Sequence, residues 1–107
     1  MTNTIDEYIK GWLVGDFKPA LIESKDIEVG LKYYKRGNYE ASHVHNIITE
    51  YTIIVKGVVE MNDHMYSTGE IVKIEPGIST DFRCLSDEAI TLVIKTPSVP
   101  SDKHFIK

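Results

Sequence analysis

Two histidines and one glutamate, His43, His45 and Glu50, lie close together in the sequence and could bind a metal ion. Imidazole nitrogens and carboxylate oxygens are the usual protein ligands of divalent transition metals. Two histidines and one carboxylate on one side of an ion form a facial triad, which holds Fe(II) and also suits Mn, Ni, Zn or Cu. These three residues therefore predict a divalent transition metal as cofactor.

The spacing of the three residues requires extended chain on both sides of a short loop. Successive side chains of a strand point to opposite sides, so His43 and His45 project from the same side of an extended segment. If the loop over residues 46–49 lets the chain step sideways, Glu50 enters from the neighbouring strand. A His-x-His pair alone is common, so the prediction depends on the elements around it.

Strand patterns do surround the three residues. Residues 26–35 alternate with a period of two, which is typical of a half-buried strand. Ile27, Val29, Leu31 and Tyr33 lie on one face of this segment, and Glu28, Lys32 and Tyr34 lie on the other.

Further short strands follow, separated by turn signals such as Gly57, Asn62-Asp63 and Pro76-Gly77. The predicted strands cover residues 43–45, 51–56, 58–61, 71–75 and 89–95. A short helical turn at residues 5–10 precedes them, and residues 96–107 form an extended arm. Many short strands with Gly and Pro turns predict an all-β sandwich or barrel.

Composition excludes several classes of protein. The chain has 107 residues, a net charge of −4 and an apolar fraction of 42%, which predicts one domain over residues 1–107. The acidic balance argues against a nucleic-acid-binding module, and no apolar run is long enough to span a membrane. A single cysteine, Cys84, forms no internal disulfide. The first residues lack the pattern of a signal peptide, so we expect a cytoplasmic location.

The stretch over residues 37–57 resembles the first motif of the cupin superfamily. That motif is Gly, five residues, His-x-His, three or four residues, Glu, six residues and Gly. Its fixed positions are filled by Gly37, His43, His45, Glu50 and Gly57. The resemblance implies a small, cupin-2-like, single-domain protein with a core barrel over about residues 12–96 and an arm at each end. The implied fold is a jelly-roll barrel, or double-stranded β-helix, of two antiparallel sheets.

The second cupin motif is only partly present. It reads Gly, five residues, Pro-x-Gly, two residues, His, three residues and Asn. Gly69 and Gly77 are in register, whereas Glu75 holds the proline position. Thr80 stands where the family has a metal-binding histidine, and Cys84 stands where it has asparagine.

The missing histidine leaves three interpretations. In the first, His43, His45 and Glu50 bind the metal alone and leave open positions for water or substrate. In the second, Asp81 or Cys84 serves as a replacement ligand, which requires an irregular backbone. In the third, no metal binds tightly and the histidines act as acids, bases or hydrogen-bond donors, as the barrel histidines do in some cupins that process nucleotide-linked sugars.

A pocket for a small molecule is expected beside these residues. Thr52 shares a face with Glu50, which makes a mixed polar and apolar lining. Thr80, Cys84 and Arg83 are further candidates for the pocket, although Cys84 is more often a buried apolar residue. His64 is expected to be a solvated turn residue.

Two hypotheses for function follow. The first is an enzyme that uses a metal to act on a small polar substrate, and the second is a metal-free module that recognises a sugar or other metabolite. The segment over residues 94–103 resembles the ending of some small bacterial and phage cupins that accompany sugar-modifying genes, which favours a carbohydrate or nucleotide sugar. A homodimer is also expected, in which the apolar run around Trp12 and Leu13 extends the partner's sheet.

Overall fold

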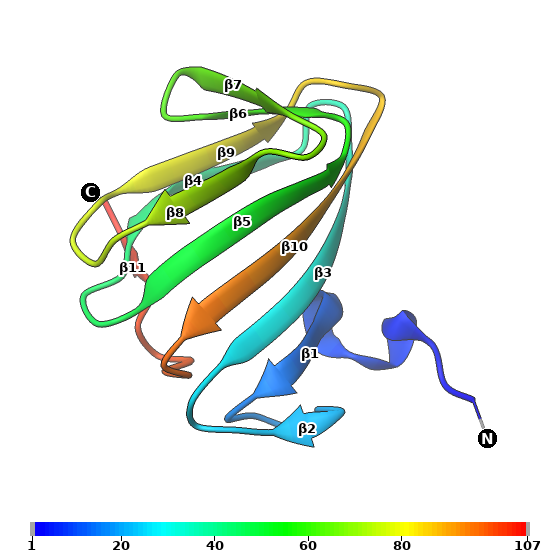
Figure 1. Ribbon diagram of the computed structural model, residues 1–107, viewed down its shortest axis with the longest axis vertical. Coiled ribbons are helices and arrows are strands. Elements are labelled where there is room, and N and C mark those ends of the chain that lie inside the picture. The colour runs from blue at the N-terminus through cyan, green and yellow to red at the C-terminus, as the bar shows by residue number, and fades with distance from the viewer. Residues whose placement is uncertain (1, 107) are drawn as a thin grey trace.

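The computed structural model describes residues 2–106, and nearly all of its regular structure is strand (Figure 1). Two 3₁₀ turns, η1 (Ile5–Glu7) and η2 (Ile9–Gly11), precede the first strand. No helix in this range is long and apolar enough to cross a membrane. The strands are β1 (Trp12–Gly15), β2 (Ile22–Glu23), β3 (Glu28–Lys35), β4 (Tyr39–Val44), β5 (Thr49–Lys56), β6 (Val58–Met61), β7 (His64–Ser67), β8 (Ile71–Ile74), β9 (Thr80–Cys84), β10 (Glu88–Thr96) and β11 (His104–Phe105).

The strands form two sheets, as expected for a jelly roll. The first has the order β2-β1-β3-β10-β5-β8, and the second has the order β11-β4-β9-β6-β7. Neighbouring strands are antiparallel except β1 and β2, which pair in parallel. Figure 1 shows the second sheet crossing behind and above the first, so that the inner faces enclose a common interior. The all-β prediction is confirmed.

Turn chemistry fixes several of the predicted boundaries. The turn expected at Asn62-Asp63 joins β6 to β7, and both residues adopt positive φ angles of 50° and 64°. A two-residue turn of this kind matches the twist of a hairpin. The expected strands at 51–56, 58–61, 71–75 and 89–95 correspond to β5, β6, β8 and β10. Strands β2, β7, β9 and β11 were not expected.

Strand β3 is confirmed, but its buried face is not the apolar one. Glu28 is 4% exposed and Gly30 is buried, whereas Tyr33, on the apolar side, is 61% exposed. Val29 and Leu31 are half-buried on the outer side of the sheet. The inner face of β3 therefore supplies polar groups to the barrel interior.

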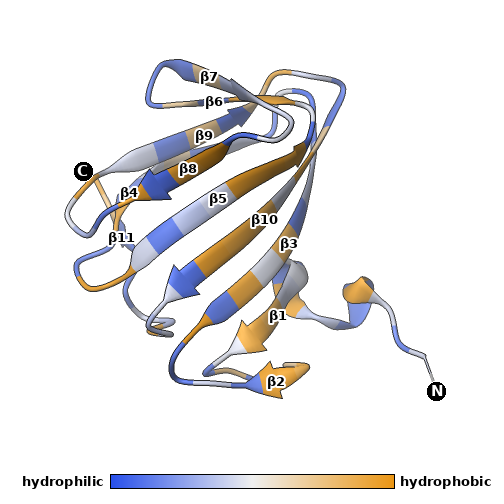
Figure 2. Ribbon diagram, in the orientation of Figure 1, coloured by the Kyte–Doolittle hydropathy of each residue, from blue (hydrophilic) through white to orange (hydrophobic). Residues whose placement is uncertain are grey.

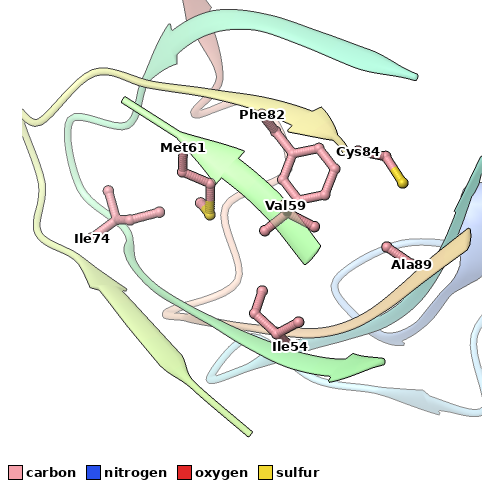
Figure 3. Packing of buried hydrophobic residues seen from close by; sticks show 7 residues of the cluster. All are labelled: Ile54, Val59, Met61, Ile74, Phe82, Cys84 and Ala89. Carbon is pink, nitrogen blue, oxygen red and sulfur yellow. The ribbon is translucent and has the colours of Figure 1, made fainter. Parts of the chain in front are cut away.

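An apolar cluster holds the two sheets together (Figure 3). Ile54 from β5 and Val59 from β6 are both fully buried, and Phe82 from β9 lies against them. Each fully buried aliphatic side chain stabilises the fold by about 2 kcal/mol. The cluster consists of Ile54, Val59, Met61, Ile74, Phe82, Cys84 and Ala89.

The interior changes from apolar to polar along single strands. On β5, Ile54 joins the cluster, whereas Thr52 and Glu50, earlier on the same face, are polar and buried. On β10, Ala89 is fully buried in the cluster, whereas Lys95 lies at the other end of the same face. Figure 2 shows the apolar half of β5 next to its polar half. One end of the barrel is therefore a core and the other is free to hold a site.

Gly57 lies at a close approach of two backbone segments at the apolar end of the barrel. Its φ is +100°, and a Cβ here would lie 2.4 Å from the Glu88 carbonyl oxygen. Gly69 has a similar φ of +94° but open space around it. We expect Gly57→Ala to cost about 3 kcal/mol, from backbone strain and the steric clash together, and Gly69→Ala about 1 kcal/mol, from strain alone. Urea denaturation measures both, and equal losses would contradict the close approach.

Candidate metal centre and binding pocket

A β-bulge in β4 turns the two histidines inward. Glu40 pairs with Phe82 of β9 and His43 pairs with Thr80, so β4 has one more residue than β9 between these two pairs. A bulge of this kind changes which face the following residues occupy. Glu40 faces the interior before the bulge, and His43 and His45 face it afterwards, with exposures of 8% and 4%.

Asp102, far along the chain, fixes the loop between the histidines and the glutamate. Its carboxylate accepts hydrogen bonds from the backbone amides of Asn46, Ile47 and Ile48 at 3.0, 2.8 and 3.0 Å. Burial alone would raise the pKa of this carboxyl, but the three amide hydrogen bonds outweigh burial and lower the pKa to about 2. The carboxylate is therefore ionised at neutral pH and holds the chain where it passes from β4 in one sheet to β5 in the other.

The three predicted ligands converge in the structure. His43, His45 and Glu50 each offer a nitrogen or oxygen atom, and these atoms all lie within 4.8 Å of one another. The two imidazole rings have centroids 5.2 Å apart and are nearly perpendicular, at 77°. All three side chains are buried.

The hydrogen bonds around the cluster leave ligand atoms free. The His43 Nδ1 lies 3.2 Å from the Ala41 carbonyl oxygen, so Nδ1 carries the proton and Nε2 keeps its lone pair. Neighbours of this kind fix the tautomer of metal-binding histidines. Glu50 is oriented by Thr52, whose hydroxyl donates to Oε2 at 2.9 Å.

His45 provides the strongest sign that a ligand is needed. Its Nε2 is fully buried and has no hydrogen-bond partner, and a buried polar atom without a partner is costly. Burial, together with the positive charge of Lys95, lowers the pKa of His45 to about 4. The imidazole is therefore neutral at pH 7, which is the form that binds metals. The three residues fit a divalent transition metal.

The other predicted site residues are divided between the cluster and the rest of the barrel. Thr80 is 4% exposed and pairs with His43, and its hydroxyl is buried without a partner. Asp81 lies outside the group of converging ligand atoms, and its carboxylate accepts from the Asn62 amide.

Two candidate pocket residues lie away from the cluster. Cys84 is 1% exposed in the apolar core, and its thiol donates to the Ser86 carbonyl. Arg83 is exposed, because alternation along β9 turns it outward, and its guanidinium lies over the Tyr39 ring. The expectation that these two residues line the pocket is therefore corrected: the alternation of β9 turns Arg83 outward, and Cys84 faces inward but lies in the apolar core.

A cavity of about 510 Å³ opens beside the cluster, and its lining includes His43 and Glu50. It also includes residues that the sequence analysis did not assign to the site: Trp12 of β1, Lys32 of β3 and Lys95 of β10. The Lys95 ammonium lies 4.0 Å from the Glu50 Oε1. The alternation of β10, with Thr91 and Val93 on the same face as Lys95, is the signal that could have placed this lysine inside.

Solved structures share this fold. One is an uncharacterized conserved protein with a double-stranded β-helix domain from Klebsiella pneumoniae, with a TM-score of 0.76, 19% identity and coverage of 97% of this chain and 89% of that one. Another is a cupin-2 domain containing protein from Shewanella frigidimarina, with a TM-score of 0.59, 19% identity and coverage of 69% and 74%. A third is the DMSP lyase DddQ from Ruegeria pomeroyi, with a TM-score of 0.72, 18% identity and coverage of 88% and 49%.

These likenesses show that the chain has the double-stranded β-helix fold of cupins. No protein-family model and no curated protein matches the sequence.

The three hydrogen bonds between Asp102 and the loop amides give the first test of the site. We expect Asp102→Asn to lose about 2 kcal/mol of stability at pH 7, because asparagine keeps only one acceptor oxygen and turns its NH2 group toward at least one of the three backbone amides. The pKa of the native carboxyl, about 2, lies below its ordinary value of 3.8. The stabilisation is therefore complete above about pH 4 and is lost as the pH falls through about 2.

Urea denaturation at pH 7 and near pH 2 measures this loss, and the two proteins should converge at the lower pH. Asp87→Asn is the matched control, because Asp87 forms an exposed ion pair with Arg36 that contributes less than about 1 kcal/mol. Equal losses in the two variants at pH 7 would show that the three amide hydrogen bonds do not stabilise the loop.

Proposed function

We propose that the chain binds one divalent transition metal through His43, His45 and Glu50 and acts as an enzyme on a small polar molecule in the adjoining cavity. The convergence of three buried ligand atoms within 4.8 Å carries this proposal. The partnerless Nε2 of His45 supports it, because a bound metal would satisfy that atom. The donor set suits Fe, Mn, Ni, Zn or Cu.

The chain's own residues would orient the ligands and leave room for a substrate. The Ala41 carbonyl fixes the His43 ring, and the Thr52 hydroxyl fixes the Glu50 carboxylate. Three protein ligands would leave room for a substrate, and a metal held by them would supply Lewis-acid chemistry. A threonine hydroxyl is a poor ligand for these metals, so we assign Thr80 to the wall of the site.

Named enzymes among the similar structures favour catalysis over simple recognition. These include the DMSP lyase DddQ and an oxalate decarboxylase from Lactobacillus farciminis. One fold supports many functions, so this likeness supports the proposal without choosing a reaction. The carbohydrate ligand and the cytoplasmic location stay predictions from the sequence.

A metal-free binding module is the second candidate. The Lys95 ammonium lies 4.0 Å from the Glu50 carboxylate and supplies a positive charge to it without a metal. In this alternative, His43 and His45 donate or accept hydrogen bonds from a bound metabolite.

The two candidates differ in metal content. Elemental analysis of protein purified without a histidine tag should find about one transition metal per chain, because three preorganised ligands bind with high affinity. His43→Ala should lose the metal, whereas His64→Ala, which changes an exposed histidine of the β6–β7 hairpin, should keep it. Thr80→Val should also keep it and should unfold at higher urea concentration, because it removes a buried hydroxyl without a partner.

A protein without metal, even after reconstitution with each candidate ion, would contradict the metal proposal. Ligand-induced stabilisation that survives a chelator would then support the binding module. At a hundredfold excess of ligand over Kd, that stabilisation is about 2.7 kcal/mol. Loss of metal in Thr80→Val would instead make Thr80 a ligand.

We also propose a homodimer, although not through the segment predicted from the sequence. Strand β1, which holds Trp12 and Leu13, is paired on both sides, by β2 and β3, so it has no free edge for a partner. The outer face of the larger sheet is a better candidate. Leu92 pairs there with Leu31 and Ile53 on its two neighbouring strands, and an apolar outer face favours burial against a second copy.

The dimer is tested by light scattering at micromolar concentration. Wild-type protein should be a dimer, and Leu92→Glu should be a monomer with an unchanged circular dichroism spectrum, because a carboxylate at the centre of the face opposes burial. Ile78→Glu changes an exposed residue of the β8–β9 loop and should stay dimeric. A monomeric wild-type protein would remove the proposed dimer.

A further inference from the structure

Two lysines make cation–π contacts with one indole ring in the cavity beside the candidate metal centre. The Lys32 Nζ lies 4.4 Å from the centroid of the Trp12 ring, and the Lys95 Nζ lies 4.6 Å from it. The lysines come from neighbouring strands, β3 and β10, and both line the cavity. An aromatic face attracts cations, so the indole holds both ammonium groups at the cavity wall.

Gly30 makes this arrangement possible. Its Cα pairs with that of Trp12, and a Cβ at this position would lie 2.7 Å from the indole Cε3. The ring therefore lies across bare backbone, beside the inward-facing Lys32 of the same strand. The tryptophan and the two lysines are positioned by strands on both sides and not by a loose loop.

The charge of the cavity is opposite to that of the whole chain. The chain carries −4, yet five lysines and three glutamates line the cavity. They are Lys10, Lys18, Lys32, Lys95, Lys103, Glu28, Glu40 and Glu50. A divalent metal at the cluster would add further positive charge.

The three glutamates already have hydrogen-bond donors. Glu28 accepts from Ser98, Glu40 accepts from Tyr34, and Glu50 accepts from Thr52. Each carboxylate is therefore oriented by a neutral hydroxyl and keeps its negative charge, but lysines still outnumber glutamates in the lining, five to three.

The positive charges of the cavity lysines are only partly balanced by neighbouring groups. Burial, reinforced by the nearby positive charge of Lys95 and opposed by Glu40, lowers the pKa of Lys32 to about 8. The Lys32 ammonium donates one hydrogen bond, to the Lys10 carbonyl at 2.7 Å, and keeps other donors for a ligand. The Lys95 side chain is only 12% exposed. Positive charge gathered in a partly enclosed cavity favours an anionic ligand.

We propose that Lys32 and Lys95 form a carboxylate subsite, so that the ligand is a small organic acid held by these lysines at one end and by the metal cluster at the other. This rests on the proposed function for the end at the cluster. Lysine ammonium groups attract carboxylates and phosphates alike as point charges, so a parallel titration with inorganic phosphate separates the two kinds of anion. A cavity of about 510 Å³ is of the size that holds a small metabolite.

Calorimetric titration with malonate and with malonamide tests the charge requirement, because the two molecules have the same carbon skeleton and differ in charge. Wild-type protein should bind malonate with a Kd of about 1 mM or lower and malonamide at least about tenfold more weakly. Inorganic phosphate is titrated in parallel and should bind more weakly than malonate. The metal content is measured before and after each titration.

Variants of the two lysines locate the subsite. Lys32→Met and Lys95→Met should each weaken malonate binding about tenfold, and Lys32→Arg should keep most of the affinity because it keeps the charge. Lys35→Met is the matched control, because Lys35 is on the same strand as Lys32 but is exposed outside the cavity. It should change the affinity less than about twofold. Circular dichroism confirms that each variant is folded.

The outcomes separate this proposal from the proposed function. Malonamide binding as tightly as malonate, or malonate binding that is unaffected by both methionine variants, would overturn the carboxylate subsite even if one metal per chain is present. Phosphate binding more tightly than malonate would overturn the assignment to a carboxylate. Lysine-dependent malonate binding in a chain that takes up no metal would support the subsite and overturn the metal proposal.

Discussion

The buried carboxylate of Asp102 is the interaction on which the site depends. Three consecutive amides, those of Asn46, Ile47 and Ile48, point at one carboxylate and are all satisfied by it. This loop carries the chain from the second sheet to the first, so it sets the distance between His45 and Glu50. A loop without such an acceptor would leave three amide donors to water, and buried Ile48 would lose its fixed place. The negative charge costs little because three donors surround it.

The candidate metal centre spans both sheets, which ties its geometry to the core. His43 and His45 come from β4 and the residue after it, whereas Glu50 comes from β5 in the opposite sheet. The apolar cluster at the other end of the barrel fixes how the sheets face each other. Tight packing resists small displacements, so the core protects the convergence of ligand atoms within 4.8 Å. The polar end can then keep partnerless atoms such as the His45 Nε2, and the burial of the apolar end offsets their cost.

Local patterns in the sequence predicted the candidate metal ligands. The other contacts around the site depend on packing between distant parts of the chain, which local patterns do not show. The convergence of His43, His45 and Glu50 was predicted because alternation along a strand and one sideways step give their directions, and the match to the first cupin motif supported it. Asp102 was out of reach, since it contacts amides more than fifty residues earlier through a tail with no strand pattern. Arg83 was assigned inward although β9 turns it outward, because strand β9 was not recognised and its phase was unknown. The polar face of β3 is buried because it lines the cavity. The hydrophobic alternation of this strand therefore did not identify its buried face.

Charge connects the candidate metal centre to the cavity beside it. Lys95 lies against Glu50 on one side and against the Trp12 ring on the other, so it belongs to both. A divalent metal placed beside this ammonium raises the local positive charge, and an anion placed between them lowers the energy of both cations. The metal then increases the affinity for the anion, and the anion increases the affinity for the metal by the same factor, as reciprocal coupling requires. A neutral ligand would supply no such compensation, so the two lysines and the indole that both contact would give the cavity a preference that the two histidines and the glutamate alone would lack. The inward polar face of β3 therefore has a role in selecting the ligand, because it brings Lys32 to the same ring.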